Sequence, residues 1–234
     1  MIYTFWEGKM PAYIKLCLET WKLPYTILNY ENLKEYTDFD IESTKRFTLP
    51  QIADAVRVHI LRDNGGYWLD ADTIMIGDKL PEETILGNNS TRQNTIGFLH
   101  AQKPHEDFFE IWAEYQDKVI GDTYDYEWDV LGNRFTDFYL LYTDSDIQIG
   151  EISRRWIETY FMPDCLRPFA YEQVYFENSY CLSDLWETDI LMLHNSWTPD
   201  WYKKLTREQV LESKCTMSNV LREVLENAID ADKA

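Results

Sequence analysis

Apolar and polar positions alternate with two different periods along the first third of the chain. Residues 2–6 form a β-branched and aromatic run, which predicts a first strand. Apolar residues at helical spacing follow Pro11 and predict a helix over 11–22, and the apolar stretch 25–28 predicts a second strand. A strand, a helix and a second strand in this order are typical of an α/β domain.

The clearest helix runs from about Pro50 to Asp63. Its apolar residues recur on one face, a proline occupies its first position, and Asn64-Gly65-Gly66 supplies a left-handed stop. Two short strands are predicted directly after the glycines, at 67–69 and 73–76, and they flank Asp70-Ala71-Asp72. This part of the chain therefore carries both the strongest helix signal and a pair of carboxylates at a strand end.

The remaining pattern is weaker but still predicts regular elements. Strands are expected at 95–99, around 159–162 and at 189–193, and helices at 106–119, 129–142, 206–213 and 216–229. A chain of 234 residues suits one compact domain, although two small domains are an alternative. We expect a single α/β domain over 1–234, with a helical insertion at 106–146 and C-terminal helices over 205–234.

Charge narrows the classes of partner. The chain has 41 Asp plus Glu against 22 Lys plus Arg, a formal net charge of -19, which repels nucleic-acid phosphates and anionic lipids. Disorder is excluded as well, because 45% of the residues are hydrophobic and 9 Trp, 16 Tyr and 11 Phe are present. We therefore expect a folded, aromatic-rich protein that does not bind nucleic acid.

Cysteine spacing and the start of the chain bear on localisation. The four cysteines are scattered without a C-x-x-C pair, so buried reduced thiols are expected rather than a zinc site or a disulfide framework. Met1 leads straight into residues 2–6 without a basic region or a long apolar segment, and no apolar run of about twenty residues follows. The expectation is a cytoplasmic protein with no membrane span.

Asp70 and Asp72 are the best candidates for metal chemistry. On extended backbone, side chains two residues apart project to the same side of the sheet, so the two carboxylates are expected to converge on one spot as hard oxygen ligands for Mg²⁺ or Mn²⁺. The same Asp-x-Asp spacing occurs at 38–40 and 144–146, but only at 70–72 does it follow an apolar strand, where α/β sheets bind ligands. A solvated acidic turn is the alternative.

Asp54 and Arg57 lie three residues apart on the preceding helix and share a face. One interpretation is a surface ion pair of little energetic value. The other is that this face looks toward the metal pocket, where Arg57 neutralises phosphate and Asp54 accepts hydrogen bonds from ligand hydroxyls.

Taken together, these residues resemble a known family. The run Ala53-Asp54-x-x-Arg57, followed by Gly65-Gly66-x-Trp68-Leu69-Asp70-x-Asp72, is similar to the donor-binding signature of DXD-containing glycosyltransferases. That group includes capsular polysaccharide synthesis transferases, Och1-type mannosyltransferases and, more distantly, the glucosylating domains of clostridial toxins. Residues 2–8 resemble the family's first strand, and Leu193-His194-Asn195-Ser196-Trp197 resembles its late segment near the diphosphate.

The resemblance implies a GT-A fold, a Rossmann-like nucleotide-sugar transferase, with Mn²⁺ or Mg²⁺ as cofactor. It implies catalytic roles for Asp54, Arg57 and Asp70, and a metal site at Asp70, Asp72 and His194. Donor-binding roles are implied for Phe5, Trp6, Asp54, Arg57, Trp68, Asp70, Asn195, Ser196 and Trp197. For His194 a core histidine near a strand end remains the alternative, and for Trp197 a buried anchor.

The reaction implied is retaining transfer of a hexose from a nucleotide diphosphate sugar, with UDP-galactose or UDP-glucose favoured, to a saccharide acceptor. The product would be a capsular or surface polysaccharide, and a lipid-linked acceptor would bring the protein to a membrane through partners. A toxin-like protein glycosyltransferase is an alternative. Outside the transferases, a metal-dependent hydrolase or a carbohydrate-binding module is a further one.

Segment 106–146 is the expected acceptor side. It holds twelve acids, two bases and eleven aromatic residues, which suit sugar rings and hydroxyls. Helical spacing nevertheless predicts that most of Phe109, Trp112, Phe135, Phe138 and Tyr142 belong to the core, which leaves the 124–128 loop as the part expected to meet ligand.

Overall fold

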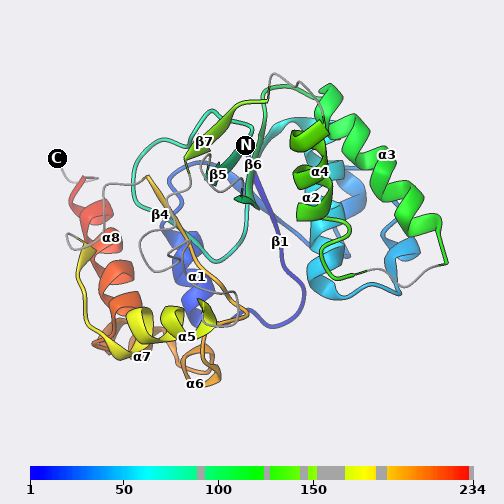
Figure 1. The fold of residues 1–234 in the computed structure, drawn as a ribbon. Coiled ribbons are helices and arrows are strands. Elements are labelled where there is room, and N and C mark those ends of the chain that lie inside the picture. Colours follow the sequence, from blue (N-terminus) through cyan, green and yellow to red (C-terminus); the bar gives the residue numbers. More distant parts are fainter. Residues whose placement is uncertain (89–92, 124–126, 143–146, 152–166, 183–188, 232–234) are drawn as a thin grey trace. The chain divides into compact units, whose positions relative to one another are not determined.

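The strand, helix and strand predicted at the start are present in the computed structural model as β1 (Ile2–Phe5), α1 (Ala12–Glu19) and β2 (Tyr25–Leu28). The structure describes residues 1–88, 93–123, 127–142, 147–151, 167–182 and 189–231. The chain divides into two compact units, drawn together in Figure 1. Unit 1 is Met1–Glu7, Pro24–Asp70 and Pro81–Ile152, and unit 2 is Gly8–Leu23, Ala71–Leu80 and Ser153–Ala234. The expectation of one domain over the whole chain stays a prediction.

Unit 1 is built on a mixed six-stranded sheet, which confirms the predicted α/β class. The strand order is β2-β1-β3-β6-β5-β7, with β3 at Gly66–Leu69, β5 at Ile85–Asn88, β6 at Gln93–Ala101 and β7 at Ile149–Glu151. β1 pairs in parallel with both β2 and β3, whereas β6 runs antiparallel to β3 and β5. β5 and β7 were not predicted.

Helices α2 (Leu49–Asn64), α3 (Asp107–Gly121) and α4 (Asn133–Tyr142) belong to the same unit, and α2 packs directly on α3 (Figure 1). α2 begins at a capping box in which Thr48 and Gln51 satisfy each other's backbone groups, and it ends at Gly65. Gly65 has φ 65°, and a Cβ there would lie 2.9 Å from the carbonyl carbon of Lys103. Only glycine meets both requirements without strain.

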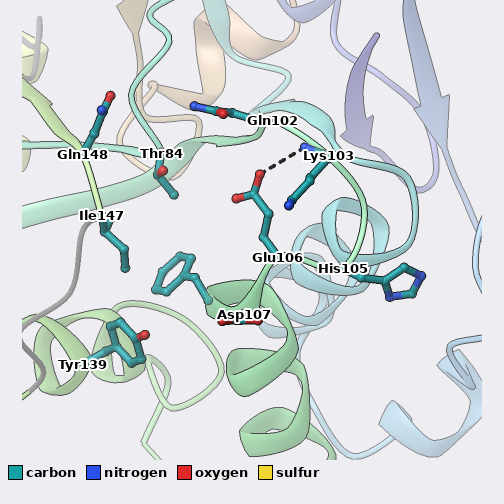
Figure 2. A pocket seen from close by; sticks show the side chains of 10 residues that line it. Thr84, Gln102, Lys103, His105, Glu106, Asp107, Tyr139, Ile147 and Gln148 are labelled. Carbon is teal, nitrogen blue, oxygen red and sulfur yellow. Dashed lines mark hydrogen bonds between the residues drawn. The ribbon is translucent and has the colours of Figure 1, made fainter.

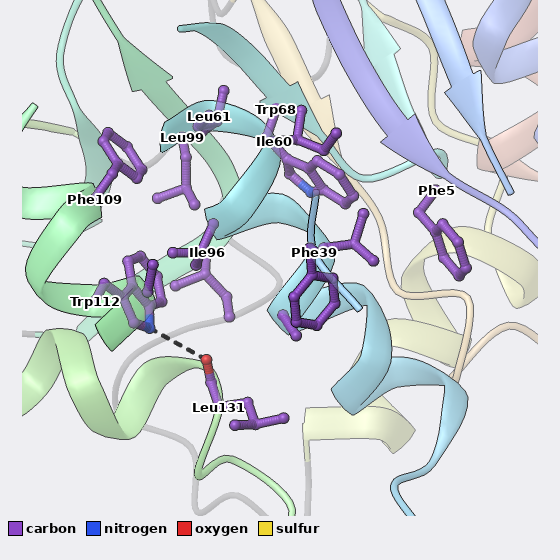
Figure 3. Close-up of a cluster of buried hydrophobic side chains, with 14 of the residues drawn as sticks. Phe5, Phe39, Ile60, Leu61, Trp68, Ile96, Leu99, Phe109, Trp112 and Leu131 are labelled. Atoms are coloured by element: carbon purple, nitrogen blue, oxygen red, sulfur yellow. Dashed lines mark hydrogen bonds between the residues drawn. The ribbon is translucent and has the colours of Figure 1, made fainter. Parts of the chain in front are cut away.

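The core of unit 1 joins residues from across its sequence (Figure 3). Phe109 and Trp112 of α3 are fully buried, Phe135 of α4 is 8% exposed, and the indole of Trp112 donates to the Leu131 carbonyl at 3.2 Å. The prediction that the 106–146 aromatics form core is therefore confirmed for these three. Phe138 and Tyr142 are 54% and 78% exposed, so the expectation that most of the five spaced aromatics belong to the core is met by the other three.

Unit 2 holds a two-stranded antiparallel sheet, β4 (Thr73–Met75) with β8 (Ile190–Met192), and mainly helices. Both strands match predicted ones, and α7 (Arg207–Glu212) and α8 (Thr216–Ala231) match the predicted C-terminal helices. The strand expected around 159–162 lies outside the described residues. Elements not predicted are η1 (Leu33–Glu35) and η2 (Ile41–Thr44) in unit 1, and α5 (Arg167–Glu172), the π-helical η4 (Gln173–Glu177) and α6 (Asp200–Lys203) in unit 2.

Candidate functional site

Arg57 is the centre of a buried charge network in unit 1. Its side chain is 6% exposed and lies 2.9 Å from Asp54 Oδ1 and 3.3 Å from Asp70 Oδ1. Its guanidinium also donates to the carbonyl of Ile96 on β6 and lies 5.1 Å from the ring centre of Trp68. One cation thus holds two carboxylates together at the end of β3, the edge where α/β sheets bind ligands.

Asp54 and Arg57 share a face of α2, as their spacing predicts, but the pair is not on the surface. Asp54 is 7% exposed, and its backbone carbonyl accepts from the buried amide of Gln116 at 2.9 Å. The ion pairs of Arg57 place it to position Asp54 and Asp70. Because the Arg57 side chain is as buried as that of Asp54, direct contact between its guanidinium and a ligand phosphate would need a rearrangement. The surface ion pair considered from sequence is therefore wrong for these two residues.

Burial makes Asp54 unusual among the acids. Desolvation raises the pKa of Asp54 to about 7, Asp70 and Asp129 add to the increase, and Arg57 opposes it. The turn before α4 sits directly against this carboxyl group, because a Cβ on Gly132 would lie 2.8 Å from Asp54 Oδ2. Asp54 therefore titrates near neutrality in a tightly fitted place, as acid–base and hydrogen-bonding groups of active sites do.

Asp70 is the exposed member of the network. Its side chain is 38% exposed, and its Oδ1 accepts from the indole of Trp68 at 2.9 Å while pairing with Arg57. Trp68 is 1% exposed and so is closed to ligand, which corrects its predicted donor-binding role. Its place in the core instead fixes the orientation of the Asp70 carboxylate.

The geometry assumed for Asp70 and Asp72 is also wrong. Residues 71–72 form a turn, and the strands on either side belong to different sheets, so Asp70 and Asp72 do not lie on one extended strand. Period-two alternation therefore cannot bring their side chains together. Asp70 is the last residue of its stretch of unit 1, and Asp72 belongs to unit 2.

Asp72 has its own support within unit 2. It is 9% exposed, and its Oδ2 accepts from the backbone N–H of Asn195 at 2.6 Å, while the Asp72 carbonyl accepts from the N–H of Leu193 at 3.2 Å. The side-chain oxygen of Asn195 accepts from the hydroxyl of buried Tyr13 on α1 at 2.5 Å. Asp72 and Asn195, predicted as a metal ligand and a donor-binding residue, are thus hydrogen-bonded to each other, and Tyr13, which the sequence did not single out, supports Asn195.

The remaining residues of the late segment form an aromatic cluster. The ring centres of His194 and Trp197 lie 3.7 Å apart, and the ring of Tyr171 makes T-shaped contacts with both. His194 and Trp197 are half-buried and Ser196 is exposed. The metal role of His194 and the donor roles of Ser196 and Trp197 stay predictions, with side chains partly open to a ligand.

Phe5 and Trp6 differ in exposure at the end of β1. Phe5 is 7% exposed and packs in the core against Tyr30, at 5.7 Å between ring centres, so little of its surface is left for a nucleotide base. Trp6 is half-buried, and its indole N–H has no hydrogen-bond partner among the described residues. A buried N–H without a partner suits a ligand that supplies a hydrogen-bond acceptor. Trp6 is therefore a better candidate than Phe5 for contact with the donor.

The donor set fits a hard divalent cation. Among the described residues no group of three or more His, Cys, Asp or Glu could hold a metal ion by itself. Mg²⁺ in phosphate-transfer sites is usually held by one or two carboxylates together with substrate phosphates and water. Carboxylates such as Asp70 and Asp72 match that mode rather than a protein-only metal cage.

Several side chains in segment 106–151 remain outside this network. Trp128 is 73% exposed, whereas residues 124–126 of the expected acceptor loop lie outside the described residues.

The cysteines also depart partly from expectation, since Cys17 and Cys215 are buried and free but Cys181 is exposed. Cys165 is not among the described residues.

Sequence reasoning missed Gly132, Gln116 and Tyr13, which support Asp54 or Asn195. Each acts from a distant point in the chain, and Tyr13 is 182 positions from Asn195. Gly132 lies inside the helix predicted at 129–142 and just before the observed α4, but nothing in its neighbourhood indicates which side chain it meets. No local pattern could have found these three residues.

Comparison with known proteins gives one family and several distantly similar solved structures. Two solved structures of the glycosyltransferase GlyE from Streptococcus pneumoniae TIGR4 have TM-scores of 0.44 and 0.47 and are 14% and 12% identical to this chain. The first is the apo form, and in both cases the matched region covers 99% of this chain and 63% of the GlyE chain. These values are too low to carry an activity from GlyE to this chain.

No curated protein matches the chain. Among the described helices, none combines the length and apolar character needed to cross a bilayer. The family model for capsular polysaccharide synthesis proteins matches residues 1–161, which include all of the unit 1 charge network and Asp72. The chain therefore belongs to the capsular polysaccharide synthesis protein family.

Proposed function

We propose that the chain is a metal-dependent, retaining glycosyltransferase that moves a hexose from a nucleotide diphosphate sugar to a saccharide acceptor during capsular polysaccharide synthesis. The observation that carries the proposal is Arg57, buried between Asp54 and Asp70 at the carboxyl end of β3. Family membership and the resemblance to the DXD transferases support it. UDP-galactose and UDP-glucose are the favoured donors.

In this proposal the bond between the anomeric carbon and the phosphate oxygen breaks, and an acceptor hydroxyl forms the new bond to that carbon and loses its proton. A bound Mn²⁺ or Mg²⁺ would supply charge neutralisation for the departing diphosphate. Asp70 is the carboxylate open to ligand, and Trp68 and Arg57 hold it in place. Asp54, with a pKa near 7, could exchange hydrogen bonds with sugar hydroxyls only after the same rearrangement that Arg57 requires, because both side chains are buried.

Asp72 and the late segment supply the second part of the proposed site. The backbone N–H of Asn195 fixes the Asp72 carboxylate, which we assign to the cation together with Asp70, and His194 is the candidate third ligand. Trp6 would stack on the base of the nucleotide. Retention of configuration rests on the resemblance alone and is tested by determining the anomeric form of the first product.

The test is a thermal-shift screen of UDP- and GDP-sugars with and without Mn²⁺. A ligand at about a hundred times its dissociation constant should add roughly 2.7 kcal/mol to the free energy of unfolding. Asp72→Asn should keep the fold, because its amide oxygen can still accept from Asn195, but should lose metal-dependent binding. Asp38→Asn is the matched control, since exposed Asp38 occupies the same Asp-x-Asp spacing. If no nucleotide sugar stabilises the protein in the presence of Mn²⁺, the proposal is wrong.

A further inference from the structure

Unit 1 contains a cavity that the proposed transfer reaction does not use. It has a volume of about 470 Å³ and lies between the end of β6, the start of α3 and the segment before β7 (Figure 2). This volume is within the usual range of small-molecule sites.

The cavity lies at the opposite edge of the sheet from Asp70. β3 and β6 are antiparallel, with Leu69 opposite Phe98 and Gly66 opposite Ala101, and the Asp70 N–H donates to the Gly97 carbonyl at 2.8 Å. The cavity begins just after Ala101, so roughly 13 Å of strand separates it from the Asp70 end. It is therefore a separate place on unit 1.

An apolar floor and a polar rim line the cavity. Phe108 is 6% exposed and, with half-buried Tyr139 and Ile147, forms the apolar part. The exposed rim side chains are Gln102, Lys103, Asp107 and Gln148. Within the part of the chain that the structure describes, none of these four side chains has a hydrogen bond or ion pair.

The loop that carries two of the rim residues is held in one conformation. The backbone N–H of Lys103 donates to Glu106 Oε1 at 3.0 Å, and that of His105 donates to the Arg62 carbonyl at 2.7 Å. His105 has φ 58°, and its ring Nδ1 lies 2.6 Å from Glu110 Oε1. The backbone of this loop is thus held in place before any ligand arrives, which lowers the conformational entropy that the loop loses on binding.

The chemistry of the lining selects a class of ligand. Glu106 and Asp107 place two carboxylates beside the single ammonium of Lys103, so a phosphate or another polyanion would be repelled. A purely apolar ligand would leave the rim amides and carboxylates without partners. A sugar ring has an apolar face for the floor, and its hydroxyls can donate to the carboxylate of Asp107 and both donate to and accept from the amides of Gln102 and Gln148.

We propose that this cavity is a second saccharide-binding site, which holds neutral sugar residues of a polysaccharide chain away from the reacting edge. Saccharide binding in the cavity is tested independently of the transfer chemistry, whereas the role given to it in polysaccharide synthesis rests on the proposed function. A polymer bound there would stay with the enzyme between successive encounters with the Asp70 edge, which is the effect of a second binding site on one ligand.

The experiment is saturation-transfer NMR and calorimetric titration of the full chain with neutral gluco- and galacto-oligosaccharides. The double variant Gln102→Ala with Gln148→Ala removes two exposed rim amides and should weaken binding about tenfold, as expected for two lost hydrogen bonds. Gln173→Ala is the matched control, because Gln173 is an exposed glutamine of unit 2. Saturating UDP with Mn²⁺ should leave the titration unchanged.

Three results would overturn the assignment. They are no binding of any neutral oligosaccharide in the series, unchanged affinity in the double variant, and competition by UDP with Mn²⁺. Tighter binding of inorganic phosphate than of the oligosaccharides would likewise exclude a neutral saccharide as the ligand. The first two results do not bear on whether a nucleotide sugar binds at Asp70 and Asp72, which the Asp72→Asn variant tests.

Discussion

Asp70 in unit 1 and Asp72 in unit 2 are two positions apart in sequence but are held by different kinds of interaction. Asp70 is 38% exposed at its side chain and depends on charged and aromatic side chains, Arg57 and Trp68. Asp72 is 9% exposed and is fixed by the backbone N–H of Asn195, in surroundings that include the hydroxyl of Tyr13. The Asp70 carboxylate is thus oriented by a buried cation, whereas the Asp72 carboxylate accepts from a backbone N–H.

This difference determines how each carboxylate responds to substitution of the residues around it. A side-chain ion pair in a buried place is sensitive to removal of either partner, because the group left behind keeps its charge without compensation. A backbone N–H remains whatever side chain is substituted nearby. Asp70 should therefore be disturbed by single substitutions of its partners, whereas Asp72 should respond to changes in the loop around Asn195.

The largest effect is expected from Arg57→Met, which removes the cation and keeps much of the volume. Asp54 and Asp70 would then share a buried place with no positive charge, and the free energy of unfolding should fall by about 3–5 kcal/mol. Urea denaturation of both proteins measures this difference.

Arg134→Met is the matched control for that substitution. Arg134 is half-exposed and pairs with exposed Glu127 at 3.2 Å, so its loss should change stability by no more than about 1 kcal/mol. Equal effects of the two substitutions would contradict the view that Arg57 supports both carboxylates from a buried position.

The Arg57 network also illustrates what the sequence could predict. α2 was predicted almost to its ends from its period, its proline and its glycine stop, and the three-residue spacing placed Asp54 and Arg57 on one face. Those signals act within one or two helical turns. Burial of the pair was not predicted, because β6 and the turn at Gly132 cover it from 39 or more positions away.

The Asp-x-Asp segment shows the opposite outcome. The two flanking strands were predicted correctly, but the inference that both carboxylates project from one extended strand was wrong, since residues 71–72 turn and the strands join different sheets. Strand propensity is local, whereas the choice of partner strand depends on β6 for β3 and on β8 for β4. Alternating periodicity cannot distinguish one bent connection from one continuous strand.

A second effect should appear in the pH dependence of stability. The pKa of Asp54 is about 7 in the folded chain, against an ordinary value of 3.8, so the folded protein binds more protons between these values. The contribution of Asp54 to the free energy of unfolding is complete below about pH 4. It is lost as the pH rises toward 7, by at most roughly 1.4 kcal/mol per pH unit. Asp54→Asn should remove this slope.

The measurement is urea denaturation of wild type and Asp54→Asn at a series of pH values from 4 to 8. The informative quantity is the difference between the two curves, because other carboxylates contribute equally to both. Asp38→Asn, at an exposed position, should run parallel to wild type. A difference that is flat across this range would mean that Asp54 titrates as an ordinary carboxylate.

The smallest effect tests the Asp72 half of the comparison. Tyr13→Phe removes the hydroxyl that donates to Asn195 Oδ1 and should lower the free energy of unfolding by about 1 kcal/mol, the usual contribution of one hydrogen bond. Tyr142→Phe is the control, because Tyr142 is 78% exposed and should tolerate the change. If Tyr13 acts on the ligand through Asn195, then Tyr13→Phe and Asn195→Ala should weaken binding of UDP with Mn²⁺ non-additively in a double-mutant cycle. Additive losses would mean that Tyr13 supports the fold of unit 2 but not the orientation of Asn195, and the Tyr13 hydroxyl would then be structural rather than part of the proposed site.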